Sequence, residues 1–140
     1  MNIKNPYLPI DQDWLKLNIE EPIEQDLPII DPHHHLWDLD FGRYLHLDFL
    51  SDINSSGHNV LASVYIMSSA NTQIYDKTSA KEYESIPEIV FACSEAEKAK
   101  NIVTNKCKIN ESIVGSLDLR YGKKLLPVIE KAISLSSGKL

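Results

Sequence analysis

The sequence predicts an α/β fold built on a parallel sheet. Three apolar segments rich in β-branched residues indicate strands, at 27–31, 59–67 and 112–119. A stretch with helical spacing of its apolar residues follows each strand, at 45–53, 86–105 and 123–136. Strands that alternate with crossover helices form parallel sheets. The expected order of elements is therefore β-α-β-α-β-α.

The first 27 residues form a polar, proline-punctuated extension ahead of this unit. Within it, Asp11 is a suitable N-cap for a short helix that carries Trp14, Leu15 and Leu17. The first strand then leads into a run of histidines. Residues 36–44 are expected to form a loop.

The helices are predicted from apolar spacing and from their ends. Gly57 is a natural stop for the first one, and Pro87 fits the first turn of the second. In the second helix, a single stripe is expected to be buried, made of Ile89, Val90, Cys93, Ala96, Ala99, Ile102 and Val103. In the last helix the expected buried side chains are Leu126, Ile129 and Ile133.

Composition narrows the class of protein. With 140 residues, 43% apolar and 24% charged, the chain has the size and composition of one soluble globular domain. A formal charge of −6 gives no basic field for nucleic acid or anionic lipid. No apolar run approaches the roughly 20 residues that span a bilayer, and no secretory signal opens the chain. Cys93 and Cys107 have no metal-like or redox-like spacing, so a cytoplasmic protein is expected.

The most informative motif is DPHHHLWD at residues 31–38, directly after the first strand. Side chains alternate between the two faces of a strand, so His33 and His35 point the same way and His34 points to the opposite face. Two neighbouring imidazoles at a strand end can bind one divalent metal ion. Asp31 is expected to orient an imidazole by a hydrogen bond. A pair of solvated or hydrogen-bonded histidines is the alternative.

This motif, with GHNV at 57–60 and IVG at 113–115, resembles the amidohydrolase-related family of TIM-barrel metal-dependent hydrolases, including its lactonase-like branch. The resemblance implies that residues 28–140 are the first three units of a (β/α)8 barrel, after the extension 1–27. It implies that His33 and His35 bind a divalent metal, zinc or manganese. The metal would polarise the carbonyl of a lactone, ester or amide and activate a water.

The resemblance also implies that part of the site lies elsewhere. A complete barrel of this type needs roughly 250 residues, and in the family later strands carry further metal ligands and the general base. That base is therefore expected beyond Leu140, and the chain alone is expected to have no more than trace activity. Some lactonase-like relatives act without a metal, in which case the same histidines would bind substrate or stabilise an oxyanion.

Four other residues bear on the site. Trp37 and Arg120 are candidates for substrate binding, with loop packing and a surface ion pair as the respective alternatives. His46, near the first helix, and His58, in the turn before the second strand, are not expected to be ligands.

Two other functions fit the same residues. A non-catalytic fragment or interaction module would associate with itself through exposed strand edges. A TatD-like nuclease or PHP-type phosphoesterase also begins with an Asp-x-His-x-His strand, but Trp37, Asp38 and the N-terminal extension favour the amidohydrolase-related branch.

Overall fold

The computed structural model describes residues 11–40, 42–68, 71 and 74–140. In chain order its elements are α1 (Gln12–Leu15), β1 (Pro28–His34), β2 (Trp37–Leu39), β3 (Gly42–Tyr44), α2 (His46–Ser55), β4 (Asn59–Ile66), the 3-10 helix η2 (Lys81–Tyr83), α3 (Ile86–Lys100), β5 (Lys108–Val114), the 3-10 helix η3 (Leu119–Lys124) and α4 (Leu125–Leu135). The short helix expected after Asp11 is present but ends at Leu15, before Leu17, and Asp11 Oδ1 accepts hydrogen bonds from the backbone N–H groups of Asp13 and Trp14.

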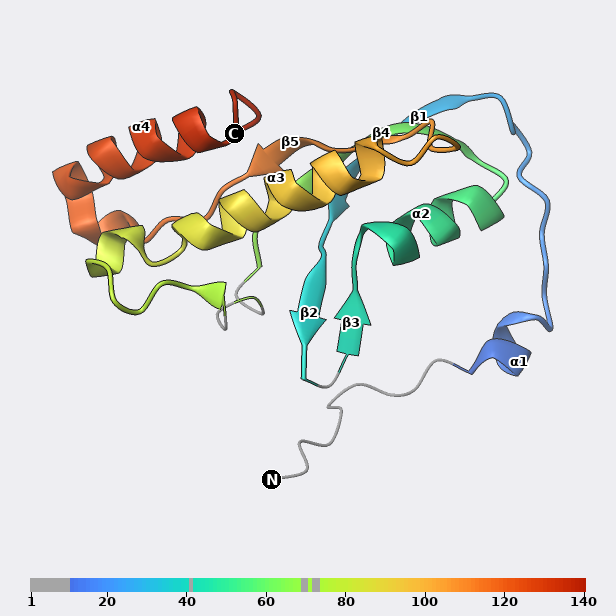
Figure 1. Cartoon of the computed structure of the whole chain (residues 1–140). Helices are drawn as coiled ribbons and strands as arrows, with labels where there is room; N and C mark the ends of the chain where they lie inside the picture. The colour runs from blue at the N-terminus through green and yellow to red at the C-terminus, as the bar shows by residue number, and fades with distance from the viewer. Residues whose placement is uncertain (1–10, 41, 69–70, 72–73) are drawn as a thin grey trace.

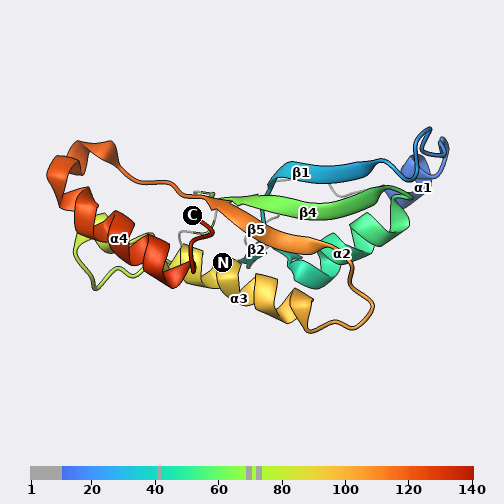
Figure 2. The same ribbon diagram turned by 90° about the horizontal axis from the view of Figure 1, so that it is seen from above.

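The main sheet has three strands in the order β1-β4-β5, and both neighbouring pairs are parallel. Figure 2 shows the three strands side by side, with β4 in the middle. Tyr65 on β4 is opposite His34 on β1 and Ile113 on β5, so the carboxyl ends of the three strands lie at the same edge. The α/β fold with a small parallel sheet is confirmed.

The helices α2 and α3 lie on the same side of the sheet, and α1 and α4 lie at opposite ends of the molecule (Figures 1 and 2). The core forms between this side of the sheet and the helices. Its buried members are Leu36, Phe49, Leu50, Tyr65, Met67, Ile86, Ile89, Ala92, Ala99, Cys107, Ile109, Ile113, Leu125, Val128 and Ala132. No helix in the described part of the chain has both the length and the apolar character needed to cross a membrane.

The segment 36–44, expected as a loop, instead contains a second, antiparallel sheet of two short strands, β2 and β3. Trp37 pairs with Tyr44 in this hairpin, and their ring centroids are 5.5 Å apart. Aromatic pairs of this kind stabilise antiparallel strands. Because each strand has only three residues, the alternation that would predict it is too short to recognise in the sequence.

The third strand of the main sheet begins four residues earlier than expected and ends at Val114. Val114 pairs with Ile66, the last residue of β4, so the chain beyond Val114 has no β4 residue to pair with. Within β5, Asn110 is fully buried and has a φ of 50°, where the register between β4 and β5 shifts. Asparagine tolerates this left-handed conformation better than most residues.

Helix α3 ends at Lys100 and not at residue 105. Asn105 Nδ2 donates to the carbonyl of Ala99, a local hydrogen bond that satisfies a helix-terminal acceptor. Ile102 and Val103, placed in the buried stripe by the sequence pattern, lie beyond the helix, and Val103 is fully exposed. Both are β-branched, and such residues favour helices less than Ala or Leu does.

The buried side of α4 is also different from the expected one. Leu125, Val128 and Ala132 are buried, whereas Leu126 is 61% and Ile133 45% exposed. The helix carries apolar residues on two neighbouring stripes, and the spacing alone cannot tell which stripe faces the core.

Candidate functional site

His33 and His35 lie at the carboxyl end of β1, on the same side of the chain, as the alternation of strand side chains predicts. Their Nε2 atoms are 3.2 Å apart, and their ring planes are nearly perpendicular, at 87°. His33 is exposed and His35 is half-buried, so the pair is accessible from solvent.

A backbone contact determines which nitrogen of His35 carries the proton. Its Nδ1 lies 2.8 Å from the carbonyl oxygen of Ile66 on the neighbouring strand β4. A carbonyl oxygen only accepts hydrogen bonds, so Nδ1 carries the hydrogen and the neutral ring presents a lone pair at Nε2. That lone pair faces His33, whose Nε2 donates to it when no ion lies between the two rings.

The geometry of the pair fits a metal ion. Two nitrogen ligands of a tetrahedral zinc, each about 2.0–2.1 Å from the metal, are about 3.3–3.4 Å apart, and the observed separation is 3.2 Å. A metal-bound histidine commonly donates its other ring N–H to a backbone carbonyl, as His35 does to Ile66. Within the described residues, however, no group of three or more His, Cys, Asp or Glu side chains could hold a metal. A metal ion held by this pair would therefore need further ligands.

The third histidine of the motif has a different environment. His34 is buried, stacks on Phe49 with ring centroids 4.1 Å apart, and has its Nε2 3.0 Å from Ser63 Oγ. Burial lowers the pKa of His34 to about 4, so the ring is neutral at physiological pH. This agrees with the prediction that His34 points away from the other two.

The remaining candidates from the sequence lie around the pair or apart from it. Asp31 Oδ1 accepts a hydrogen bond from the backbone N–H of His33, 3.0 Å away, and so acts on the backbone of β1. Its expected role in orienting an imidazole stays a prediction. Trp37, half-buried at the start of β2, packs on Tyr44. Substrate binding by Trp37 also stays a prediction.

Arg120 follows β5 in the 3-10 helix η3, and its side chain is 90% exposed. Its Nε and a terminal nitrogen donate to the carboxylate of Asp118, at 2.6–2.9 Å. These hydrogen bonds lower the pKa of Asp118. This is the local surface ion pair that the sequence left as the alternative to substrate binding.

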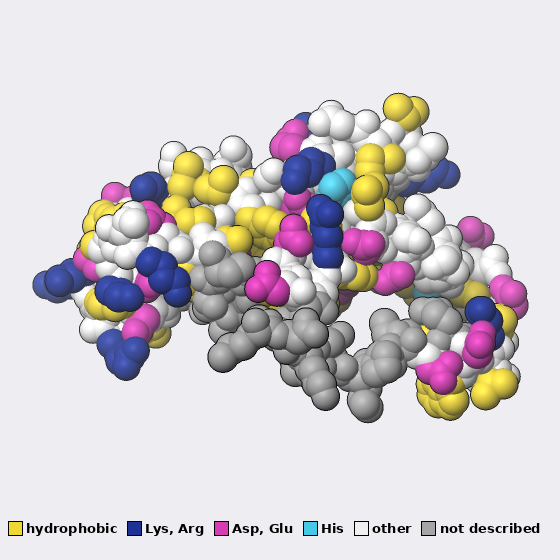
Figure 3. Space-filling model, turned by 60° about the horizontal axis from the view of Figure 1, so that its bottom comes forward, with side chains coloured by type: hydrophobic (Ala, Val, Ile, Leu, Met, Phe, Trp, Pro, Cys, Tyr) yellow, Lys and Arg dark blue, Asp and Glu magenta, His cyan; other side chains and the backbone are white. Residues whose placement is uncertain are grey.

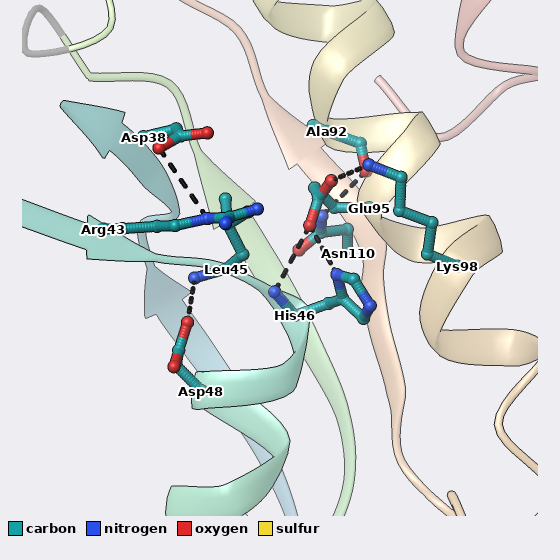
Figure 4. Close-up of polar contacts among 9 residues, drawn as sticks. All are labelled: Asp38, Arg43, Leu45, His46, Asp48, Ala92, Glu95, Lys98 and Asn110. Carbon is teal, nitrogen blue, oxygen red and sulfur yellow. Dashed lines mark hydrogen bonds and ion pairs between the residues drawn. The ribbon is translucent and has the colours of Figure 1, made fainter.

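The two histidines outside the motif are placed as the sequence predicts. His58 is exposed in the turn before β4, at the opposite end of the strand from His33 and His35. His46 begins α2, and its Nδ1 lies 2.6 Å from Glu95 Oε2 on α3. Figure 4 shows Glu95 between His46 and Lys98, whose Nζ is 2.6 Å from Glu95 Oε1. The contact with His46 joins α3 to α2, and the contact with Lys98 joins successive turns of α3.

Sequence reasoning missed a second buried carboxylate, Glu88, in the first turn of α3. Within the part of the chain that the structure describes, it accepts hydrogen bonds at 2.8–3.0 Å from the hydroxyls of Tyr65 and Tyr75, the backbone N–H of Ser68 and the side-chain amide of Asn71, all neutral groups. No pattern in the sequence separates Glu88 from the other glutamates of this helix. The partners come from β4 and from the polar loop that follows it.

The described residues thus combine two convergent imidazole nitrogens, a backbone carbonyl that sets the tautomer of one ring, and a network of buried polar groups behind it. Such an arrangement can bind a divalent cation or hydrogen-bond an anionic or carbonyl oxygen. Comparison of the chain with protein-family models, curated proteins and solved structures finds no match.

Proposed function

We propose that this chain is the N-terminal part of a metal-dependent hydrolase of the amidohydrolase type, with His33 and His35 as its first metal ligands. The observation that carries the proposal is the pair of Nε2 atoms 3.2 Å apart at the carboxyl end of β1. The contact between His35 Nδ1 and the carbonyl of Ile66 supports it, because a hydrogen on Nδ1 leaves the lone pair of the neutral ring on Nε2, the nitrogen that faces His33.

The strand order supports the place of the pair in a barrel. The parallel strands of the main sheet pair in the order in which they occur along the chain, β1, β4 and β5, and helices α2, α3 and α4 follow them in turn. This order is compatible with the first three units of a (β/α)8 barrel, a fold in which active sites lie at the carboxyl ends of the strands. The proposal therefore includes a partial TIM barrel over residues 28–140.

When bound, a zinc or manganese ion would polarise the carbonyl of a lactone, ester or amide and lower the pKa of a water. The residues of this chain prepare the site. Ile66 keeps the proton on Nδ1 of His35, and Asp31 holds the backbone of β1 beside His33. The proposal assigns the remaining ligands and the carboxylate that accepts the proton to later strands of the barrel, so turnover by this chain alone should be at most trace.

Metal binding tests the proposal. We expect the protein to compete for Zn²⁺ with a chromogenic chelator, and His33→Asn and His35→Asn each to weaken this binding by more than about 100-fold, beyond the usual effect of losing an outer partner. The matched control is His58→Asn, since His58 is exposed and lies at the opposite strand end. Zinc binding that survives in both motif variants, or its absence in the unaltered protein, would overturn the proposed metal site.

Self-association with a second copy of the chain is a second candidate function, favoured by the outer edge of β1. Among the described residues this edge has no strand partner, and Ile30 on the same strand is 64% exposed. The edge of β5 is different, because Ile113 N–H donates to the carbonyl of Lys139. Figure 3 shows acidic and basic side chains interspersed on one face of the molecule. An open edge of this kind favours pairing between copies.

Sedimentation over a range of protein concentrations tests this second function. We expect a concentration-dependent dimer that is weakened by Ile30→Lys, since charge on an edge strand opposes pairing. A monomer at all concentrations would exclude it without affecting the proposed metal site.

A further inference from the structure

Glu88 is a fully buried carboxylate, and the hydrogen-bond partners that it has among the described residues include no cation. The described donors to its carboxylate are neutral groups of Tyr65, Ser68, Asn71 and Tyr75. Burying a carboxylate costs free energy that only good hydrogen bonds offset. The position in the first turn of α3 helps, since the amino end of a helix favours negative charge.

Two of these donors, on Asn71 and Ser68, connect Glu88 to the backbone around His35. Asn71 Nδ2 lies 3.0 Å from Glu88 Oε1 and 2.9 Å from the carbonyl of Leu36, the residue directly after His35. Leu36 is itself fully buried. Through Asn71, the carboxylate therefore reaches the backbone on the carboxyl side of His35.

The same oxygen of Glu88 also binds the chain close to Ile66, whose carbonyl accepts the hydrogen bond of His35. Ser68 N–H donates to Glu88 Oε1 over 2.8 Å, and Ser68 lies two residues after Ile66. The carbonyl of Ile66 is the acceptor for His35 Nδ1. One oxygen of Glu88 thus joins the two backbone segments between which the imidazole of His35 is held.

We propose that Glu88 is a positioning residue for His35, which fixes the imidazole in the Nδ1–H form by holding Leu36 and the end of β4 together. This inference rests on the proposed function, because the orientation of the His35 ring matters for metal binding by the pair. The burial of Tyr65 and Tyr75 beside Glu88 raises the pKa of both hydroxyls, so both remain hydrogen-bond donors over the accessible pH range.

Glu88→Gln is the central variant, because it keeps the shape of the side chain and removes its charge. We expect Zn²⁺ affinity to fall by about 10–100-fold, the usual effect of losing a group that orients a metal-bound histidine. Glu95→Gln is the matched control, since Glu95 is equally buried on the same helix but binds His46 and Lys98. Its zinc affinity should stay within about 3-fold of the unaltered protein, below the range for such a loss.

A second readout does not depend on metal. Nitrogen–proton correlation spectra of the imidazoles report which ring nitrogen of His35 carries the hydrogen. We expect one Nδ1–H form in the unaltered protein and in Glu95→Gln, and a mixture of both forms in Glu88→Gln. Asn71→Ala, which removes the link to Leu36, should behave like Glu88→Gln, and Tyr75→Phe, which leaves both backbone links in place, should not.

The outcomes separate the two proposals. If the unaltered protein binds no zinc, the proposed metal site is wrong, and the imidazole spectra still decide the role of Glu88. If Glu88→Gln and Asn71→Ala are folded and both keep the single Nδ1–H form of His35, the positioning role is wrong whatever the zinc affinity. If Glu88→Gln does not fold, the comparison of Asn71→Ala with Tyr75→Phe decides.

Discussion

Two adjacent leucines in α4 give a sharp test of how this helix packs. Leu125 is 5% exposed and Leu126 is 61% exposed, although both are leucines in the first turn of the same helix. Replacing Leu125 by Ala removes three buried carbon atoms, which at about 0.8 kcal/mol each amounts to about 2.4 kcal/mol. The cavity left behind raises the expected loss of unfolding free energy to about 3–4 kcal/mol.

For Leu126→Ala the same reasoning, scaled to its smaller burial, gives a loss below about 1 kcal/mol. Leu and Ala both favour helices, so the backbone contributes little to the difference. Urea unfolding followed by far-ultraviolet circular dichroism measures both variants. If Leu125→Ala leaves no folded protein, Val128→Ala replaces it, because Val128 is fully buried. An equal or larger loss at Leu126 would refute the orientation of α4 and favour the stripe that the sequence pattern predicts.

Two further predictions concern buried ionisable groups. Burial alone would raise the pKa of Glu95, but hydrogen bonds from Lys98 and His46 outweigh it and hold the pKa below its usual value (Figure 4). The carboxylate therefore stabilises the fold above its ordinary pKa of about 4.5 and loses this effect as pH falls through its lower pKa in the folded protein. The difference in unfolding free energy between the unaltered protein and Glu95→Gln should therefore narrow as pH falls from about 4.5 to about 3. A difference that stays constant over this range would contradict the ion-pair role. Burial raises the pKa of Cys107 to about 11. At pH 8 only about 0.1% of this thiol is then ionised to the reactive thiolate. A disulfide reagent should therefore label Cys107 in urea but hardly in the folded protein. Rapid labelling of Cys107 in the folded protein would show that the chain opens just before β5.

The parts of the fold that the sequence predicted are those encoded over short stretches. The run from Asn59 to Ile66 is apolar and β-branched as a covered strand should be, and it forms the central strand of the sheet. Pro87 and the apolar stripe behind it predicted the start of α3. The placement of His33 and His35 on one side and His34 on the other follows from strand alternation alone.

The errors occur where a distant partner decides the outcome. The limits of β5 are set by β4, whose last residue, Ile66, pairs with Val114. Contacts with the rest of the fold decide which stripe of α4 is buried, since the helix carries two neighbouring apolar stripes. The β2–β3 hairpin depends on the contact between Trp37 and Tyr44. A strand of three residues is too short for its sequence pattern to predict such a contact.

The candidate site likewise has a part that is local in the sequence, the histidine motif, and a part that is distant, the groups that orient its side chains. The two imidazoles are two positions apart in the sequence and are therefore visible as a motif, but the groups that orient them are not. The contact from His35 to Ile66 spans 31 positions, and the contact from Asn71 to Leu36 spans 35. Both cross from the residues directly after β1 to β4 or to the loop after it, so they exist only because the two strands are parallel and in this register. A one-residue slip between β1 and β4 would keep the motif intact and remove the carbonyl that sets the tautomer of His35. The chemistry of the histidine pair therefore depends on strand pairing as much as on the motif itself.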